Sequence, residues 1–189
     1  MIVFRQETED AVYLVDAFSE SVPGAIADGF VTRLTPIHKL KEADWRGIRS
    51  LSGWFSANYL RWKYRDQRTA LLLIENEART VAVLWVVPSE RIRQRYPFVS
   101  AGSSAIIACV THASCRGKGL YPAGIKAIAG SGHSPRYFIW AHKTNDSSLR
   151  GIVKGGGQRF GEFTRIRWFR GLINSISFRP ERQIEQRHG

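Results

Sequence analysis

The stretch that decides the fold spans residues 106–121 and reads IIACVTHASCRGKGLY. Its first residues are mostly apolar, which is typical of a buried strand. A small polar turn, an Arg-Gly-Lys-Gly loop and a segment with helical spacing at 120–129 follow. Two glycines let the backbone approach a ligand closely, and a helix N-terminus offers unpaired N–H groups at the positive end of its dipole. The stretch therefore predicts a strand, a phosphate-binding loop and a helix, in that order.

Two well-known phosphate-binding patterns do not fit this loop. An ATP-binding P-loop needs four residues between its first glycine and a Gly-Lys-Ser/Thr end, whereas Lys118 is followed directly by Gly119. A dinucleotide-binding loop needs Gly-x-Gly-x-x-Gly, and Pro122 stands where the third glycine belongs. Both alternatives are therefore disfavoured.

Length and composition predict one globular unit. The chain has 189 residues, enough to bury a core without disulfides or metals. Cys109 and Cys115 form neither a CxxC pair nor a zinc spacing, so we expect reduced thiols, no metal site and a cytoplasmic protein. Apolar runs such as residues 81–87 are far shorter than the roughly 20 residues of a membrane span. The acid-rich start does not resemble a signal peptide either.

The charge is strongly basic and unevenly placed. The net charge is +12, although the first 44 residues hold eight acidic and four basic side chains. A positive field attracts polyanions, which could be nucleic acid, acidic lipid, a phosphorylated cofactor or an acidic substrate. Charge alone does not choose among these partners.

The N-terminal part of the chain predicts short elements before the core. Residues 2–4 fit a short strand, and residues 8–18 fit a helix capped by Thr8. A turn over 21–29 and a strand over 30–34 come next. Apolar spacing then predicts helices over 40–51 and 56–65.

The remaining pattern predicts a mixed sheet. Residues 69–75 and 79–87 fit an antiparallel hairpin, and residues 104–111 fit a central strand. After the 120–129 helix come a strand over 136–141, a helix over 147–154, and a final strand pair over 159–169 and 172–178. Strand–helix–strand units within a mostly antiparallel arrangement imply an α/β fold, of the α+β mixed-sheet kind, with helices on both faces. Residues 89–96, after the hairpin, are expected to be an exposed helix or loop, and residues 179–189 to be a polar tail.

Two motifs resemble those of the GNAT superfamily of acyl-CoA-dependent N-acetyltransferases. The loop resembles the Gln/Arg-x-x-Gly-x-Gly/Ala motif of that family, with Arg116 and Gly119 in its first two positions and Tyr121 in place of the usual small residue. Downstream, the Asn145-Asp146-Ser147-Ser148 sequence resembles the Asn-x-x-Ser/Ala that opens the next helix in the family. The resemblance covers residues 69–163 and implies a GNAT fold over 30–178, with 1–29 as an extension or a first strand–helix unit.

The resemblance also implies an activity and a cofactor site. It implies an enzyme that moves an acetyl group from acetyl-CoA to a primary amine of a small molecule. The basic charge adds the narrower expectation of an anionic acceptor, such as an amino sugar linked to a nucleotide, although that charge would equally serve coenzyme A. Backbone N–H groups and cations of the loop would hold the phosphates, and the splayed strand would pair with the pantetheine arm. The implied cofactor-binding residues are Cys109, Val110, Thr111, Arg116, Gly117, Lys118, Gly119, Leu120, Asn145 and Ser148.

Candidate catalytic residues lie near the end of the central strand. His112 could act as a general base toward the amine, or it could be a turn histidine bonded to backbone. The family often has a tyrosine acid seven residues after the motif asparagine, a position held here by Ile152. Tyr121, Ser148 or solvent would then protonate the leaving thiolate, while positioning supplies much of the acceleration.

Aromatic and basic residues alternate just before the hairpin. Arg61, Trp62 and Tyr64 could bind the acceptor, or the helix could pack its aromatics into the core with its cations outside. This run also bears a weak resemblance to bacterial GNAT members linked to polysaccharide and amino-sugar modification. His142, at the end of the next strand, is a further candidate for acceptor binding.

Two other functions stay open at the level of sequence. The charge and the aromatic–cation run also suit a basic nucleic-acid-binding module, although no recognisable nucleic-acid motif supports it. The tyrosine missing at position 152 leaves room for a GNAT fold that binds acyl-CoA without catalysis. Pairing with a second copy of the chain, as a homodimer, also stays open.

Overall fold

The computed structural model describes residues 5–17, 29–168 and 173–181. Its elements in chain order are β1 (Arg5–Asp16), β2 (Val31–Pro36), α1 (Glu42–Ser52), α2 (Trp54–Lys63), β3 (Ala70–Asn76), β4 (Arg79–Pro88), β5 (Ser104–Thr111), α3 (Leu120–Ala129), β6 (Arg136–His142), α4 (Asp146–Lys154), β7 (Gln158–Trp168) and β8 (Ile173–Pro180). Short 3-10 turns, η1 (Ile37–Lys39), η2 (Ser89–Arg91) and η3 (Ala113–Cys115), precede α1 and follow β4 and β5.

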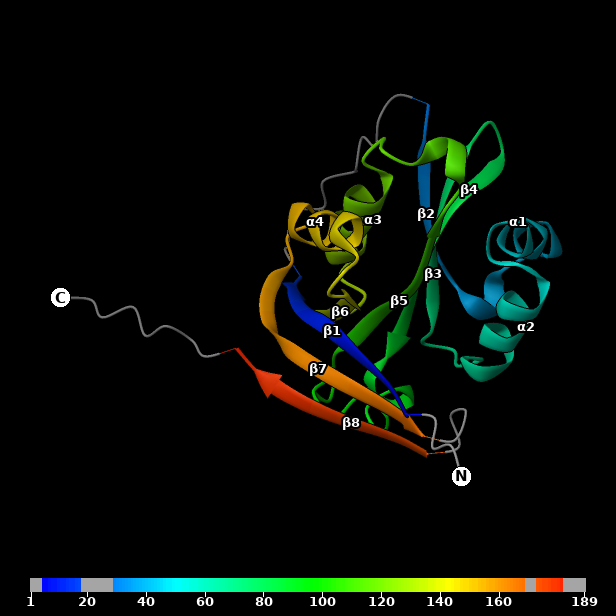
Figure 1. Ribbon diagram of the computed structural model, residues 1–189. Coiled ribbons are helices and arrows are strands. Elements are labelled where there is room, and N and C mark those ends of the chain that lie inside the picture. The colour runs from blue at the N-terminus through cyan, green and yellow to red at the C-terminus, as the bar shows by residue number, and fades with distance from the viewer. Residues whose placement is uncertain (1–4, 18–28, 169–172, 182–189) are drawn as a thin grey trace.

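The strands form one mixed sheet in the order β2-β3-β4-β5-β6-β1-β7-β8. Every neighbouring pair is antiparallel except β5 and β6, which are parallel and joined through α3. Helices α3 and α4 cover one face, and α1 and α2 cover the other (Figure 1). The predicted α/β mixed-sheet fold is therefore confirmed.

The hairpin of β3 and β4 supplies the centre of both cores. Because successive side chains of a strand point to opposite faces, Leu72 and Leu84 pack with α3, while Leu71 and Trp85 pack with α1 and α2. Strands buried on both faces have near-continuous apolar sequences, as residues 81–87 do. Burial on two faces thus explains why this run lacks the alternation of a surface strand.

An aromatic cluster covers the β6–β1–β7 part of the sheet. Phe98 stacks on Phe163 with ring centroids 5.3 Å apart and on Phe178 at 4.9 Å. Tyr96 contacts Trp140 at 4.6 Å. Residues 89–96 were expected to be exposed, yet Ile92 and Tyr96 are buried in this cluster, while the arginines of the segment face solvent. The cluster therefore fixes a connection that has little regular structure of its own.

The helix predicted over residues 8–18 is wrong. This region forms β1, which lies between β6 and β7 and is hydrogen-bonded to both. Ala11, Tyr13 and Val15 face α3 and α4, whereas Val12 faces the aromatic cluster. A short run that is apolar on every residue fits a buried strand and a buried helix equally well. The open ladders of β6 and β7, far away in sequence, decide in favour of a strand.

The other predicted elements are confirmed, with ends that differ by a few residues. Strand β8 extends to Pro180, into the stretch predicted to be a tail. The predicted strand at 2–4, the turn over most of 21–29 and the tail beyond 181 lie outside the described residues. Within the described ranges, no helix is long and apolar enough to cross a membrane.

The position of β1 between two partners can be tested with proline. Val12 pairs with Trp140 on one side and Gly161 on the other, so Val12→Pro should remove a ladder hydrogen bond in the middle of the sheet. We expect this variant to lose its cooperative unfolding transition in urea. Val31→Pro, at the first residue of edge strand β2, should unfold cooperatively at nearly the wild-type urea concentration. Wild-type stability of Val12→Pro would contradict the observed sheet order.

Candidate functional site

The site begins at a bulge in β5. Ala108 has a φ of +48°, an uncommon conformation for a residue other than glycine. The β4–β5 register shifts at this point, because Val83 pairs with Val110 whereas Trp85 pairs with Ile107. A bulge of this kind bends the strand that carries it. The bend turns the second half of β5 away from its other neighbour, β6.

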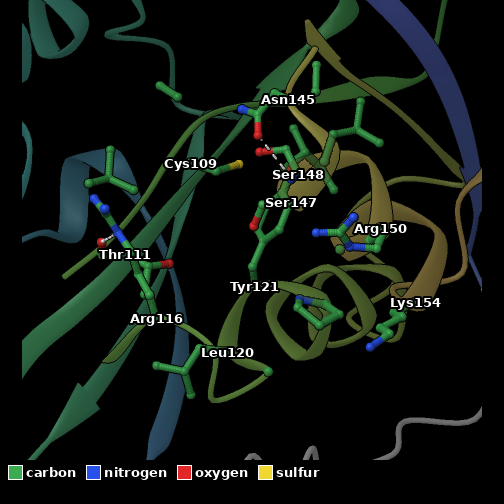
Figure 2. A pocket seen from close by; sticks show the side chains of 18 of the residues that line it. Cys109, Thr111, Arg116, Leu120, Tyr121, Asn145, Ser147, Ser148, Arg150 and Lys154 are labelled. Atoms are coloured by element: carbon green, nitrogen blue, oxygen red, sulfur yellow. Dashed lines mark hydrogen bonds between the residues drawn. The ribbon is translucent and has the colours of Figure 1, made fainter. Parts of the chain in front are cut away.

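The sheet opens where β5 bends. Pairing between β5 and β6 ends at Ile106 and Ile139, while β6 continues to pair with β1 as far as His142. The edges of β5 and β6 that face each other beyond this point are therefore free. A cavity of about 870 Å³ fills the gap, with α3 and α4 along its sides (Figure 2). Cys109, Val110 and Thr111, which are predicted to bind the cofactor, line it.

The mouth of this cavity is a loop of unpaired backbone N–H groups, here called the N–H cradle (residues 117–121). Gly117 and Gly119 have φ values of +77° and +75°, and a Cβ on either would meet nothing within 4 Å. Gly119 is the N-cap of α3. Within the described chain, the N–H groups of the cradle have no hydrogen-bond acceptor. Such groups at a helix N-terminus favour an anion.

Cations surround the cavity on both sides. Arg116 lines the cavity and its Nε donates to the Thr111 carbonyl oxygen at 3.4 Å. Arg150 and Lys154 line the opposite side from α4. Lys118, predicted to bind the cofactor, is outside the lining, with its Nζ 5.7 Å from the centre of the Phe30 ring. The positive side chains that line the cavity are thus partly different from the predicted ones.

One face of α4 lines the cavity without having been predicted from the sequence. Ser147, Arg150, Gly151 and Lys154 all line the cavity and follow the i, i+3, i+4, i+7 spacing of one helical face. That spacing was visible in the sequence. Only the fold shows that this face looks into the cavity rather than into solvent.

Asn145 both caps α4 and lines the cavity. Its Oδ1 accepts a hydrogen bond from the Ser148 N–H at 3.1 Å, which satisfies one of the free donors of the first turn. Asn145 and Ser148 both belong to the lining, at the end of the cavity away from the cradle (Figure 2). The capping role and the predicted cofactor contact are therefore compatible.

Tyr121 projects from α3 across the cavity toward α4 and β5. A Cβ on Gly151 would lie 2.6 Å from Cδ1 of Tyr121, so the ring rests directly on that glycine. The hydroxyl interacts with the thiol of Cys109. Burial raises the pKa of Tyr121 above its ordinary value, with a further rise from Cys109, and burial raises the pKa of Cys109 to about 12. Both groups stay protonated at neutral pH, so Cys109 is a poor nucleophile and Tyr121 can only donate a proton.

Ile152, where the family acid is expected, is fully buried in the core. Its neighbour Gly151 presents a bare backbone to the cavity, and the Tyr121 ring fills the space. A tyrosine thus faces the cavity over α4 although α4 carries none.

The two histidines occupy matching turns outside the cavity. The Nδ1 of His112 lies 2.7 Å from the Ser114 Oγ, and the Nδ1 of His142 lies 2.7 Å from the Thr144 Oγ1. Each Nδ1 also accepts the backbone N–H of the same partner at 3.3 Å. Both histidines are exposed and neither lines the cavity. The bond to backbone foreseen as the alternative for His112 is present, and its role as a base stays a prediction.

A second cavity of about 230 Å³ opens on the other face of the sheet. It shares Ile106, Ile107, Ala108 and Trp140 with the first cavity, so the two meet at the bulge. The rest of its lining comes from Tyr64, Ile92 and Tyr96. Of the residues predicted to bind an acceptor, only Tyr64 lies here, while Arg61, Trp62 and His142 do not. In the described residues, no cluster of His, Cys, Asp and Glu could hold a metal ion.

No protein-family model and no curated protein matches the sequence. Solved structures do match. A GCN5-related N-acetyltransferase from Sphaerobacter thermophilus has a TM-score of 0.61 and 12% identity over 87% of the chain. A GCN5-related N-acetyltransferase-like protein from Streptococcus suis has a TM-score of 0.57 and 14% identity over 87% of the chain. AAC(6')-Ib, solved with paromomycin and acetyl-CoA, has a TM-score of 0.51 and 16% identity over 80% of the chain.

These matches show that the chain has a GNAT-like fold. At such identities they show the fold alone. The chain spans 53% of the Sphaerobacter protein, 62% of the Streptococcus protein and 94% of AAC(6')-Ib. The first two matched proteins are thus considerably longer than this chain.

The contact between Tyr121 and Gly151 predicts an unusual alanine effect. Alanine normally stabilises a helix interior by about 1 kcal/mol relative to glycine. Gly151→Ala should instead destabilise the protein in urea unfolding, because its methyl group would overlap the Tyr121 ring. In a Tyr121→Ala background the same change should be neutral or stabilising. Equal costs of Gly151→Ala in both backgrounds would exclude the contact.

Proposed function

We propose that the protein is an acyl-CoA-dependent N-acetyltransferase that moves an acetyl group from acetyl-CoA to a primary amine of a small molecule. The observation that carries the proposal is the N–H cradle at the mouth of a cavity between two splayed strands. That cavity meets a second one, from the opposite face, at the β5 bulge. A long phosphorylated donor and a small acceptor can therefore meet there from two sides.

The first cavity fits acetyl-CoA chemically. The cradle and Arg116 would hold the pyrophosphate, and Arg150 and Lys154 would add charge from α4. The free backbone edges of β5 and β6 would pair with the two amides of the pantetheine arm, as an added strand does. Asn145 and Ser148 line the end of the cavity away from the cradle, as the resemblance to the family implies. The side chain of Lys118 lies outside the lining, so its ammonium group would attract phosphate through solvent rather than by direct contact.

The second cavity would take the amine. Its volume of about 230 Å³ suits a small amine or the amino end of a larger molecule. Tyr64, Tyr96 and Trp140 would contact the body of the acceptor, while the amine would point toward Ala108. An anionic or amino-sugar acceptor is a narrower proposal, as are contacts to it from Arg61, Trp62 and His142. A panel of candidate amines, with detection of the free thiol released from acetyl-CoA, would test the identity of the acceptor.

Tyr121 would act as the general acid. Bound acetyl-CoA supplies an acetyl group on a thioester, from which a thiolate leaves. The Tyr121 hydroxyl faces the β5 edge at Cys109 and keeps its proton at neutral pH, so it can donate that proton to the leaving sulfur. The described lining of both cavities holds no carboxylate or histidine, so the amine would lose its proton to water or by way of His112. Holding the reactants together supplies the larger part of the acceleration.

The cradle can be tested with two matched glycine variants. Gly119→Ala would place a methyl group at the cradle and strain the backbone, and should weaken acetyl-CoA binding in calorimetry by about tenfold or more. Gly156→Ala carries the same kind of strain at a φ of +95° and has open space around its Cβ, but it lies outside the cavity. Both should cost roughly 1–2 kcal/mol of stability.

Only Gly119→Ala should change the affinity for acetyl-CoA. Absence of acetyl-CoA binding by the wild-type protein would overturn the proposed function. Equal losses of affinity in the two variants would show that strain, rather than the cradle, is responsible.

Loss of the Tyr121 hydroxyl tests the proposed acid. Tyr121→Phe keeps the ring on Gly151, so acetyl-CoA affinity should be unchanged while kcat falls by about 100-fold or more. A general acid works in its protonated form and is lost as the pH rises through its pKa. The pKa of Tyr121 is raised above about 10, the ordinary pKa of tyrosine. Wild-type kcat should therefore stay constant as the pH rises to about 10, and fall only above that pH. Unchanged kcat in Tyr121→Phe would assign the proton to solvent or Ser148.

A further inference from the structure

Helix α2 exposes an unusual number of large aromatic side chains. Trp54, Phe55, Tyr59 and Trp62 are 61%, 82%, 53% and 64% exposed, and we call this set the aromatic face of α2. Single exposed apolar residues are common, but a contiguous apolar patch on one helix marks an interaction site. None of its residues lines either of the two cavities proposed to hold the reactants.

The periodicity of α2 separates two apolar faces. Phe55, Tyr59 and Trp62 follow the i, i+4, i+7 spacing of one face. Ala57 and Tyr64 lie on the opposite face and pack into the core. The aromatic face is therefore surplus to the packing of the helix against the sheet.

Cations border the aromatic face on both sides. At 3.6 residues per turn, Arg61 lies at one edge of the face and Lys63 at the other. The Arg61 guanidinium lies 4.5 Å from the centre of the Trp45 ring, and the Lys63 Nζ lies 5.4 Å from that of Tyr59. The charged end of Arg61 therefore covers the buried Trp45 ring, and that of Lys63 lies over Tyr59 of the aromatic face.

The rings of the aromatic face contact one another. The Trp54 and Phe55 rings meet edge to face with centroids 5.0 Å apart, and the Tyr59 and Trp62 rings lie 6.3 Å apart. These contacts arrange the four side chains as two pairs of rings on the exposed side of the helix. The patch is thus already formed in the isolated chain.

The local field around the patch is positive. The nearby acids are paired, since Glu42 binds Arg49 and Asp66 lies 3.0 Å from the Arg91 Nε. Arg65, just after the helix, is exposed. Together with the net charge of +12, this leaves an aromatic surface framed by unbalanced cations.

We infer that the aromatic face of α2 docks on the surface of an anionic lipid bilayer. Tryptophan and tyrosine favour the boundary between headgroups and acyl chains, and lysine and arginine beside them are attracted to acidic headgroups. A helix that carries aromatics on its outer face and cations at the borders can lie in that boundary. The protein would lie on the membrane without crossing it.

Two other occupants fit the patch less well. A second copy of the chain, related by a two-fold axis, would bring the cations that border one patch close to those of the other, and like charges repel. Single-stranded nucleic acid binds positively charged grooves in which bases stack on aromatic rings. Helix α2 lies at the outside of the molecule, beside α1 (Figure 1), and its other side packs into the core. The aromatic face is exposed and lines neither cavity.

Vesicle sedimentation tests the inference. The full chain should bind vesicles of phosphatidylcholine and phosphatidylglycerol in equal parts, bind phosphatidylcholine alone far more weakly, and lose affinity as salt rises. The double variant Phe55→Ser/Trp62→Ser should bind the mixed vesicles at least about tenfold more weakly. Val31→Ser/Val153→Ser, which removes two exposed apolar side chains elsewhere, should bind as the wild type does. Urea unfolding of each variant serves as the check on folding.

Fluorescence gives a second readout that needs no disruptive substitution. Nitroxide-labelled lipid in the mixed vesicles should quench wild-type tryptophan fluorescence, and Trp54→Phe/Trp62→Phe should lose most of that quenching while it still sediments with the vesicles. Absence of vesicle binding, or equal binding by Phe55→Ser/Trp62→Ser, would overturn the inference. So would a dimer that this variant dissolves, or a single-stranded oligonucleotide that displaces the vesicles.

Discussion

The rest of the site depends on one backbone constraint, the bulge of β5 at Ala108. A regular β5 would stay paired with β6 along its whole length, and the sheet would be closed. The positive φ of Ala108 and the register shift opposite Leu84 end that pairing after Ile106. One irregular residue thus creates two free strand edges. The cavities on the two faces meet there because both include the bulge in their walls.

Strand β1 keeps the opening rigid. Beyond Ile139, β6 is no longer hydrogen-bonded to β5, so one of its two edges is free. Without a partner on its second edge, this part of β6 would have no interstrand hydrogen bonds to hold it in the sheet. Its other edge is fully paired with β1, which β7 supports in turn. The N-terminal strand β1 therefore supports strands that come more than 100 residues later in the sequence. It lets β6 offer free N–H and C=O groups to a ligand without losing its position in the sheet.

Position 152 shows how one helix can leave room for a side chain from another. The family pattern often has a tyrosine at the position that Ile152 occupies on α4. Ile152 is buried in the core. The residue beside it, Gly151, leaves room for a ring that comes from α3, and Tyr121 takes that room. The chain thus differs from the family motifs at Tyr121 and at Ile152, and the contact between Tyr121 and Gly151 links the two differences. Neither departure by itself indicates a protein without catalysis.

Sequence alone determined the elements whose causes are local. The loop glycines, the helix start of residues 117–121 and the apolar hairpin followed from backbone freedom, unpaired helix donors and residue period. Tertiary structure decided the rest, because those choices depend on partners distant in the chain. Free ladders of β6 and β7 made β1 a strand, and the course of α4 placed Arg150 and Lys154 in the cavity. Packing against the sheet turned Tyr64 inward and left Trp62 outside, although the two belong to one aromatic run.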